Sequence, residues 1–312
     1  MPWAVLLIFF FVSFLAVPVR AIEMNNAFDT TPPTSSNIPN WNTGWPASNV
    51  TGWNYVGQIA GASGVYIGNG WVLTAGHIGF GNFTLNGVTY TAIGGTGHAI
   101  LDSDGDADLY MFQIANPPNL LPLPIRSSDP VAFSPTQAGS LVAMLGFGGG
   151  NGNLTWGVDN VTEINEYPVT PSNYSFVSND FFTDDGEVQR GSSTITNESS
   201  VVSGDSGGGD FIYNTTTRRW ELAGINEVTG SYDGYNPVTD QNYDGNGNFS
   251  GMVQLDNNAA VMSTYASQIN AYVSSTAPIS DTPTMPLPAL VVMGCLLFFA
   301  AARSFKVKDA RS

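Results

Sequence analysis

The sequence predicts an all-β protein made of two antiparallel β-barrels that end in one C-terminal helix. Short apolar runs recur about every 8–12 residues from Tyr55 onward, the spacing of a small barrel and not of alternating β-α units. The chain contains 35 Gly and 19 Pro, which favours many turns over long helices. A Pro-rich stretch from Asn116 to Pro135 divides the runs into two groups. We therefore expect one barrel over residues 53–125 and a second over 136–275.

The predicted strands follow one another with little intervening chain. They cover residues 64–67, 70–74, 83–85, 88–93 and 109–114 in the first half, and 140–145, 176–177, 188–189, 211–213, 220–225 and 251–255 in the second. A helix is expected to close the domain, because Val261, Tyr265 and Ile269 recur on one helical face. Asn257 or Asn258 can cap the start of this helix.

The chain begins with a segment typical of a signal peptide. Residues 3–17 are apolar and uncharged, and Val19-Arg20-Ala21 places small residues at the two positions that a signal peptidase reads. We expect residues 1–21 to be cleaved after Ala21, with an uncleaved N-terminal anchor as the alternative. Residues 22–52 are rich in Asn, Thr, Ser and Pro, which predicts an N-terminal extension that runs along the surface.

A second apolar segment lies near the C-terminus. Residues 285–302 carry no charge, and a helix of that length spans roughly 27 Å, enough to cross a bilayer. Four basic residues follow, as the positive-inside rule requires of a cytoplasmic end: Arg303, Lys306, Lys308 and Arg311. We therefore expect a linker over 276–284, a transmembrane segment over 285–303 and a basic cytoplasmic tail over 304–312.

The part of the chain between these two ends is strongly acidic. It holds four basic and 24 acidic residues, a net charge of about −20, which disfavours nucleic acid as a partner. The lone cysteine, Cys295, excludes an intramolecular disulfide and a Cys-based zinc site. The residues Asp240-X-Asn242-X-Asp244-Gly245 begin like a calcium loop, but Gly251 stands where the bidentate Glu is needed. Calcium and a solvated loop both stay open there, and no other cofactor is expected.

Ser206 lies among glycines in the stretch Ser203-Gly204-Asp205-Ser206-Gly207-Gly208-Gly209. This pattern indicates a hydroxyl held in a tight turn that a substrate backbone can approach. It also fits the Gly-X-Ser-X-Gly elbow of α/β-hydrolases, which requires a histidine after the serine. The two histidines, His77 and His98, both precede Ser206, so that enzyme class has no base available. The order His, Asp, Ser is the alternative, and it makes Ser206 the candidate nucleophile.

A second motif, Leu73-Thr74-Ala75-Gly76-His77, ends a predicted strand. Together with the Ser206 motif it resembles the trypsin/chymotrypsin-like (S1) serine protease family, over roughly residues 54–275. The resemblance implies two six-stranded antiparallel barrels and a serine endopeptidase that acts through an acyl-enzyme, with His77 as the general base. The backbone N–H groups of Gly204 and Ser206 would form the oxyanion hole.

The acid of this family precedes an alternating apolar strand, and Asp108-Leu109-Tyr110-Met111 is the best match. Asp102, Asp104 and Asp106 compete with Asp108, and Asp106 is the second choice. His98 has no motif around it and is expected to be structural.

The resemblance also implies the residues of the substrate pocket. Ser200 would lie at its base, with Glu227, Val228 and Thr229 along its wall. A neutral base argues against strict cleavage after Arg or Lys, although Glu198 keeps the preference open. In many relatives the residue matching Asp205 pairs with a new amino terminus, but no Ile-Val-Gly-Gly start precedes Tyr55. A catalytically silent binding module is the alternative function.

The segment Met285-Pro-Leu-Pro-Ala289, its apolar continuation and the basic cluster resemble bacterial PEP-CTERM-type sorting signals. This resemblance implies an exported protein at the cell surface or secreted, held in the membrane at least transiently by its C-terminal segment. A sorting enzyme would then be a partner in addition to protein or peptide substrates. A permanent membrane anchor is the alternative.

Overall fold

A computed structural model describes residues 22–24, 29–103, 105–132, 134, 137–148, 152–169, 176–185, 199–231 and 255–275. The expected signal peptide, linker, transmembrane segment, basic tail and Asp240 loop lie outside these residues. Within them, no helix has the length and apolar character needed to cross a membrane.

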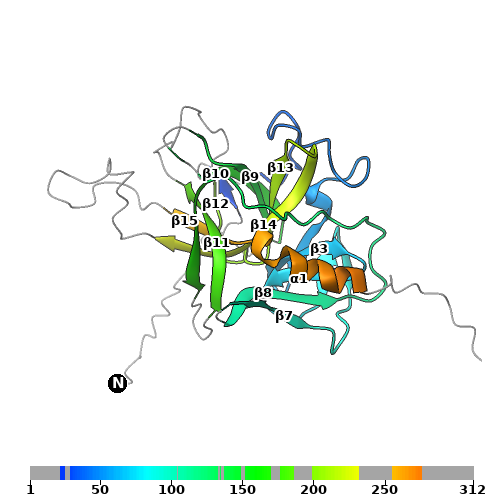
Figure 1. The fold of residues 1–312 in the computed structure, drawn as a ribbon. Helices are drawn as coiled ribbons and strands as arrows, with labels where there is room; N and C mark the ends of the chain where they lie inside the picture. Colours follow the sequence, from blue (N-terminus) through cyan, green and yellow to red (C-terminus); the bar gives the residue numbers. More distant parts are fainter. Residues whose placement is uncertain are drawn as a thin grey trace, which may run out of the picture. The chain divides into compact units, whose positions relative to one another are not determined.

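The first half of the domain is a seven-stranded antiparallel sheet (Figure 1). Its strands are β2 (Val56–Ile59), β3 (Ala62–Gly68), β4 (Trp71–Ala75), β5 (Phe83–Leu85), β6 (Val88–Tyr90), β7 (His98–Asp102) and β8 (Gly105–Gln113), in the order β6-β5-β2-β3-β4-β8-β7. The chain just after β6 returns to the end of β8, where Ile93 N donates to Gln113 O at 2.8 Å. A bridge between Ala92 and Ile114 completes this contact.

This sheet therefore differs from the six-stranded barrel that the family resemblance implied. In the sheet order, the six strands from β6 to β8 close on one another through the Ala92–Ile114 bridge. The seventh strand, β7, pairs with β8 outside this closed set. The extra strand arises because β7 and β8 form a tight hairpin, with Asp102 opposite Gly105.

The second half is a closed six-stranded barrel, as expected. Its members are β9 (Leu141–Gly146), β10 (Thr155–Val169), β11 (Phe176–Asp185), β13 (Gly209–Asn214), β14 (Arg219–Ser231) and β15 (Leu255–Val261), in the closed order β10-β11-β15-β14-β13-β9. A separate two-stranded sheet joins β1 (Glu23–Met24) to β12 (Ser199–Ser200).

The predicted C-terminal helix is α1 (Met262–Ser275), which buries Tyr265, Ile269 and Val273. It follows β15 directly, so Val261 ends a strand and does not belong to the helix. The predicted caps at Asn257 and Asn258 are wrong for the same reason, because both residues pair within the barrel.

Most described residues of the N-terminal extension are exposed or partly exposed, but a few of its side chains enter the core. Ile38 and Trp41 are fully buried. The Trp41 ring packs edge-on against Trp220 with 5.0 Å between centroids, and Trp45 stacks on Trp220 at 5.4 Å. These aromatic contacts tie the extension to β14 of the second half.

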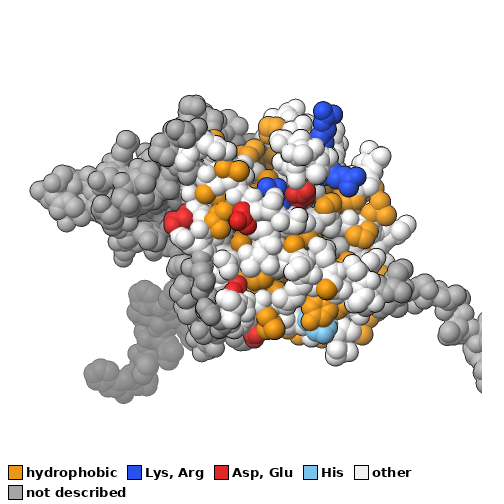
Figure 2. All heavy atoms as spheres, viewed as in Figure 1, with side chains coloured by type: hydrophobic (Ala, Val, Ile, Leu, Met, Phe, Trp, Pro, Cys, Tyr) orange, Lys and Arg blue, Asp and Glu red, His pale blue; other side chains and the backbone are white. Residues whose placement is uncertain are grey.

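Charged side chains are sparse on the face shown in Figure 2, where uncharged polar and apolar groups cover most of the described surface. Basic side chains gather near the β13–β14 hairpin. This distribution agrees with a sequence in which 11% of residues are charged.

Candidate active site

The Ser206 loop connects β12 to β13 and is shaped by two glycines. Gly204 and Gly207 have φ angles of +99° and +85°, in the left-handed region that favours glycine. A Cβ atom on Gly207 would lie 2.1 Å from the carbonyl oxygen of Ser63, so no larger residue fits. Ser63 N donates to Ser206 O at 2.9 Å, and Gly207 N donates to Asn226 O at 2.7 Å. The loop is thereby fixed to β3 of the first half and β14 of the second.

His77 lies in the turn after β4, and Asp108 lies on the adjacent strand β8. The pairing of Ala75 with Leu109 brings the two residues together. One Asp108 carboxylate oxygen accepts the His77 backbone N–H at 2.7 Å, and the other lies 2.6 Å from His77 Nδ1. Asp108 is fully buried. A proton on Nδ1 leaves Nε2 as an acceptor, which is the form a general base needs.

The competing acids lie elsewhere. Asp102 accepts hydrogen bonds from Tyr265 and Asn179, and Asp106 is exposed on β8. Asp104 is outside the described residues. His98 stacks on Tyr272 of α1 with 4.3 Å between centroids, in keeping with a structural role.

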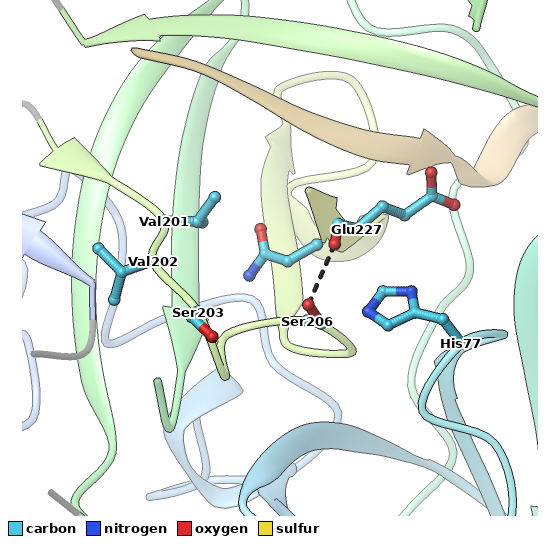
Figure 3. A pocket seen from close by; sticks show the side chains of 7 residues that line it. His77, Val201, Val202, Ser203, Ser206 and Glu227 are labelled. Carbon is cyan, nitrogen blue, oxygen red and sulfur yellow. Dashed lines mark hydrogen bonds between the residues drawn. The ribbon is translucent and has the colours of Figure 1, made fainter. Parts of the chain in front are cut away.

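Ser206 and His77 line one cavity of about 180 Å³. Figure 3 shows the imidazole directed toward the Ser206 hydroxyl. That hydroxyl donates to the Glu227 carbonyl oxygen at 3.0 Å, and the described structure has no hydrogen bond between Ser206 and His77. The amides of Gly204 and Ser206 donate to no described group, so both N–H groups are available to a ligand oxygen.

The walls of this cavity differ from the predicted set. The structure brings Glu227 into the wall, together with Val201, Val202, Ser203 and Asn226, which sequence reasoning missed. Val201 and Val202 directly precede the Ser206 motif and Ser203 is its first residue, and this proximity was the signal that could have identified them. Ser200 lies in β12, and Val228 and Thr229 lie in β14, on the strands that flank the cavity.

Asp205 lies in the Ser206 loop and is fully buried. It accepts hydrogen bonds from Val202 N at 2.8 Å and Gly148 N at 2.7 Å, and a third from the backbone of Ile22. Burial raises the pKa of the Asp205 carboxyl to about 7, while the three backbone donors act in the opposite direction. A Cβ atom on Gly146 would lie 2.2 Å from this carboxylate, so the cage around it is tight.

Ile22 is the residue that directly follows the predicted signal-peptide cleavage site, and its side chain is fully buried. The sequence search for an Ile-Val-Gly-Gly start missed it, because the contact depends on the fold and not on that motif.

Glu227, in the wall of this cavity, carries a second buried carboxyl group. Its Oε1 accepts from the Ser178 hydroxyl at 3.2 Å, and the same hydroxyl oxygen accepts from Asp108 N at 2.9 Å. Burial raises the pKa of Glu227 well above its usual range, and the negative charges of Asp180 and Asp108 add to this effect. Across the described part of the chain, no group of His, Cys, Asp and Glu side chains could hold a metal ion.

The model of the Trypsin family matches residues 44–243 of this chain. No curated protein matches it. Among solved structures, the inactive form of the Rv3671c protease is 15% identical with a TM-score of 0.44, covering 70% of this chain and 89% of its own. The active form of the same M. tuberculosis protease is also 15% identical with a TM-score of 0.44, covering 89% of this chain and 97% of its own.

Proposed function

The chain belongs to the trypsin family of serine peptidases, and from this premise we propose that it is an exported endopeptidase with the triad His77, Asp108 and Ser206. The observation that carries the proposal is the double hydrogen bond from His77 to Asp108, at 2.6 and 2.7 Å. This contact fixes the ring in a cavity whose opposite wall holds the Ser206 hydroxyl.

The proposed reaction begins when the Ser206 hydroxyl leaves the Glu227 carbonyl and turns toward His77. Nε2 of His77 takes the hydroxyl proton while Oγ attacks the substrate carbonyl carbon. The N–H groups of Gly204 and Ser206 then bind the oxyanion, and each such donor contributes roughly 3–4 kcal/mol to transition-state stabilisation. His77 returns the proton to the leaving amine, which leaves an ester on Ser206. Water activated by His77 hydrolyses that ester, while the Asp108 carboxylate stabilises the imidazolium formed in each step.

The cavity favours a substrate with an uncharged side chain. Its volume is about 180 Å³, and Val201 and Val202 form part of its wall. The carboxyl group of Glu227 is buried and hydrogen-bonded to Ser178, so it offers no charge for an Arg or Lys side chain of the substrate. Profiling with a peptide library is the direct measure of this preference.

Export fits the surroundings of Ile22. Cleavage after Ala21 would convert the Ile22 amide, which hydrogen-bonds to Asp205, into an ammonium group beside that buried carboxylate. Processing by the signal peptidase would thus supply the cation that the Asp205 cage lacks. The C-terminal segment 285–303 would hold the exported enzyme in the membrane until a sorting enzyme removes it.

An organophosphonate probe tests the proposed chemistry. The processed protein should be labelled, the Ser206→Ala variant should not, and Ser103→Ala, which removes an exposed serine between β7 and β8, should label as the wild type does. Equal labelling of the wild type and Ser206→Ala would refute the proposal.

A catalytically silent binding module is the second candidate. The hydrogen bond from Ser206 to the Glu227 carbonyl, in place of one to His77, favours it. Peptide binding without labelling or cleavage would decide for this function.

A further inference from the structure

Glu227 occupies an unusual place in the second barrel. The pairing of β14 with β15 shifts register between Asn226 and Val228, as it does at a β-bulge. Such a shift takes one residue out of the regular alternation and can re-aim its side chain. Here it leaves Glu227 almost fully buried, with both its backbone and its side chain directed at the candidate active site.

Glu227 is connected to both ends of the candidate triad. Its carbonyl oxygen accepts the Ser206 hydroxyl at 3.0 Å. Its carboxyl group accepts the Ser178 hydroxyl at 3.2 Å, and Ser178 Oγ accepts the backbone N–H of Asp108 at 2.9 Å. Because the Ser178 hydroxyl proton is directed to Glu227, a lone pair of Ser178 Oγ is free to accept the backbone N–H of Asp108. Figure 3 shows the carbonyl facing Ser206, while the carboxyl end extends toward the side of His77.

The charges around Glu227 make it a costly residue for stability. Asp108 on β8 and Asp180 on β11 are fully buried next to it, and the phenol of Tyr265 on α1 also interacts with it. Burial, and after it the negative charges of Asp180 and Asp108, hold the pKa of Glu227 well above its usual range. A hydrogen bond between the Glu227 and Asp180 side chains acts in the same direction. Groups that cost stability in this way concentrate at functional sites.

We propose that Glu227 is a positioning residue. It acts through Ser178 to hold the backbone of Asp108 in place, and Asp108 in turn holds the His77 ring facing Ser206. The inference rests on the proposed function, because positioning has a kinetic meaning only if this triad performs catalysis. Neither Glu227 nor Ser178 gives up a proton to the substrate. Both act through the groups that do.

Three variants and one control test this role. Ser178→Ala and Glu227→Ala each interrupt the connection to Asp108, whereas Glu227→Gln keeps an oxygen acceptor for the Ser178 hydroxyl. Thr183→Val removes another buried hydroxyl from the same strand, β11, where the Thr183 hydroxyl contacts Met144 Sδ at 3.9 Å. It therefore reports the effect of a buried polar deletion that leaves the triad intact.

We expect Ser178→Ala and Glu227→Ala to lower kcat by about tenfold to a hundredfold, because small displacements of a catalytic group have effects of this size. The KM of Ser178→Ala should change less than about twofold, since Ser178 does not line the cavity, so this variant separates positioning from substrate binding. Glu227→Gln should stay within about threefold of the wild type, as should Thr183→Val. The double variant Ser178→Ala/Glu227→Ala should be no slower than the slower single variant, because both changes break one connection.

Three results would overturn the inference: wild-type kcat in folded Ser178→Ala, a loss in Glu227→Gln as large as that in Glu227→Ala, or a loss confined to KM. The downfield NMR signal of the proton between His77 Nδ1 and Asp108 gives a readout independent of turnover. It should persist in Glu227→Gln and Thr183→Val and shift in the two alanine variants, and His98→Gln assigns it to His77. If the wild type neither cleaves peptides nor labels at Ser206, the proposed function fails, and the NMR comparison still decides the positioning role.

Discussion

The free energy of unfolding should depend on pH in different ways for a chain that begins at Ala21 and a chain that begins at Ile22. In the first chain, residue 22 offers Asp205 an amide N–H, and no cation among the described residues contributes to the pKa of this carboxyl group. In the second, the same nitrogen is an ammonium group. The two chains differ by one residue, so every other carboxyl group contributes equally to both.

The magnitude follows from the pKa of the Asp205 carboxyl, which burial raises from an ordinary 3.8 to about 7. A raised pKa means that ionisation of the Asp205 carboxyl group lowers the free energy of unfolding. The associated stability is fully present below about pH 4, is lost as the pH rises toward 7, and does not return above it. A difference of roughly three pKa units corresponds to about 4 kcal/mol. The chain that begins at Ala21 should lose about this much between pH 4 and pH 7 on account of Asp205.

In the chain that begins at Ile22, the ammonium group stabilises the carboxylate and lowers its pKa, so most of this loss should disappear. Urea denaturation followed by tryptophan fluorescence at pH 4, 5, 6 and 7 measures the free energy of unfolding of each chain, with both chains ending at Ser275. Asp205→Asn should abolish the difference between them. If the two chains lose stability in parallel over this range, the amino group of Ile22 does not pair with Asp205, and the proposed effect of processing is refuted.

Three further changes should have defined effects. Asp108→Asn should lower kcat by about 10⁴-fold while the circular dichroism spectrum is retained, since the amide favours the wrong imidazole tautomer, and a loss below tenfold would contradict the assignment of the acid. Gly207→Ala should destabilise the fold by about 3 kcal/mol or more in urea denaturation, because its φ is +85° and the new Cβ would lie 2.1 Å from Ser63 O; an unchanged midpoint would show that the loop adapts freely. Trp41→Ala should cost about 3–5 kcal/mol by the same measurement, as expected for a fully buried aromatic ring. A cost below 1 kcal/mol would mean that the N-terminal extension contributes little to the core.

Strands that are mostly apolar could be predicted from the sequence. The predicted run 140–145, for example, overlaps β9, and 109–114 overlaps β8. The longest strand, β10, was missed because Asp159, Asn160 and Glu163 interrupt its apolar residues. An alternating strand of this kind becomes recognisable only when its partners β9 and β11 are known.

The sequence was informative about the candidate site where chemistry is encoded locally. An Asp directly before an alternating strand led to Asp108, and the structure brings that residue to His77. The roles of Ser178 and Glu227 could not be predicted, because their contacts join β8, β11 and β14 across long intervals of chain. A one-residue shift of register, such as the one at Glu227, leaves no trace in hydropathy.

The polar composition of residues 22–52 indicated an exposed segment, yet its tryptophans are buried. Trp41 and Trp45 pack on Trp220, nearly 180 positions later in the chain. Composition cannot report such a partner, because the free energy gained depends on a tertiary contact.

The conformation of the Ser206 loop depends on Ser63, which lies in the other half of the domain. From β3 its backbone N–H binds Ser206 O, and its hydroxyl donates to Gly204 O at 3.0 Å while accepting Phe147 N at 2.8 Å. Ser63 on β3 of the first half therefore holds the Ser206 loop of the second half in its conformation. A chain whose two halves have not yet docked lacks these contacts, so its Ser206 loop would not be held in the conformation described above.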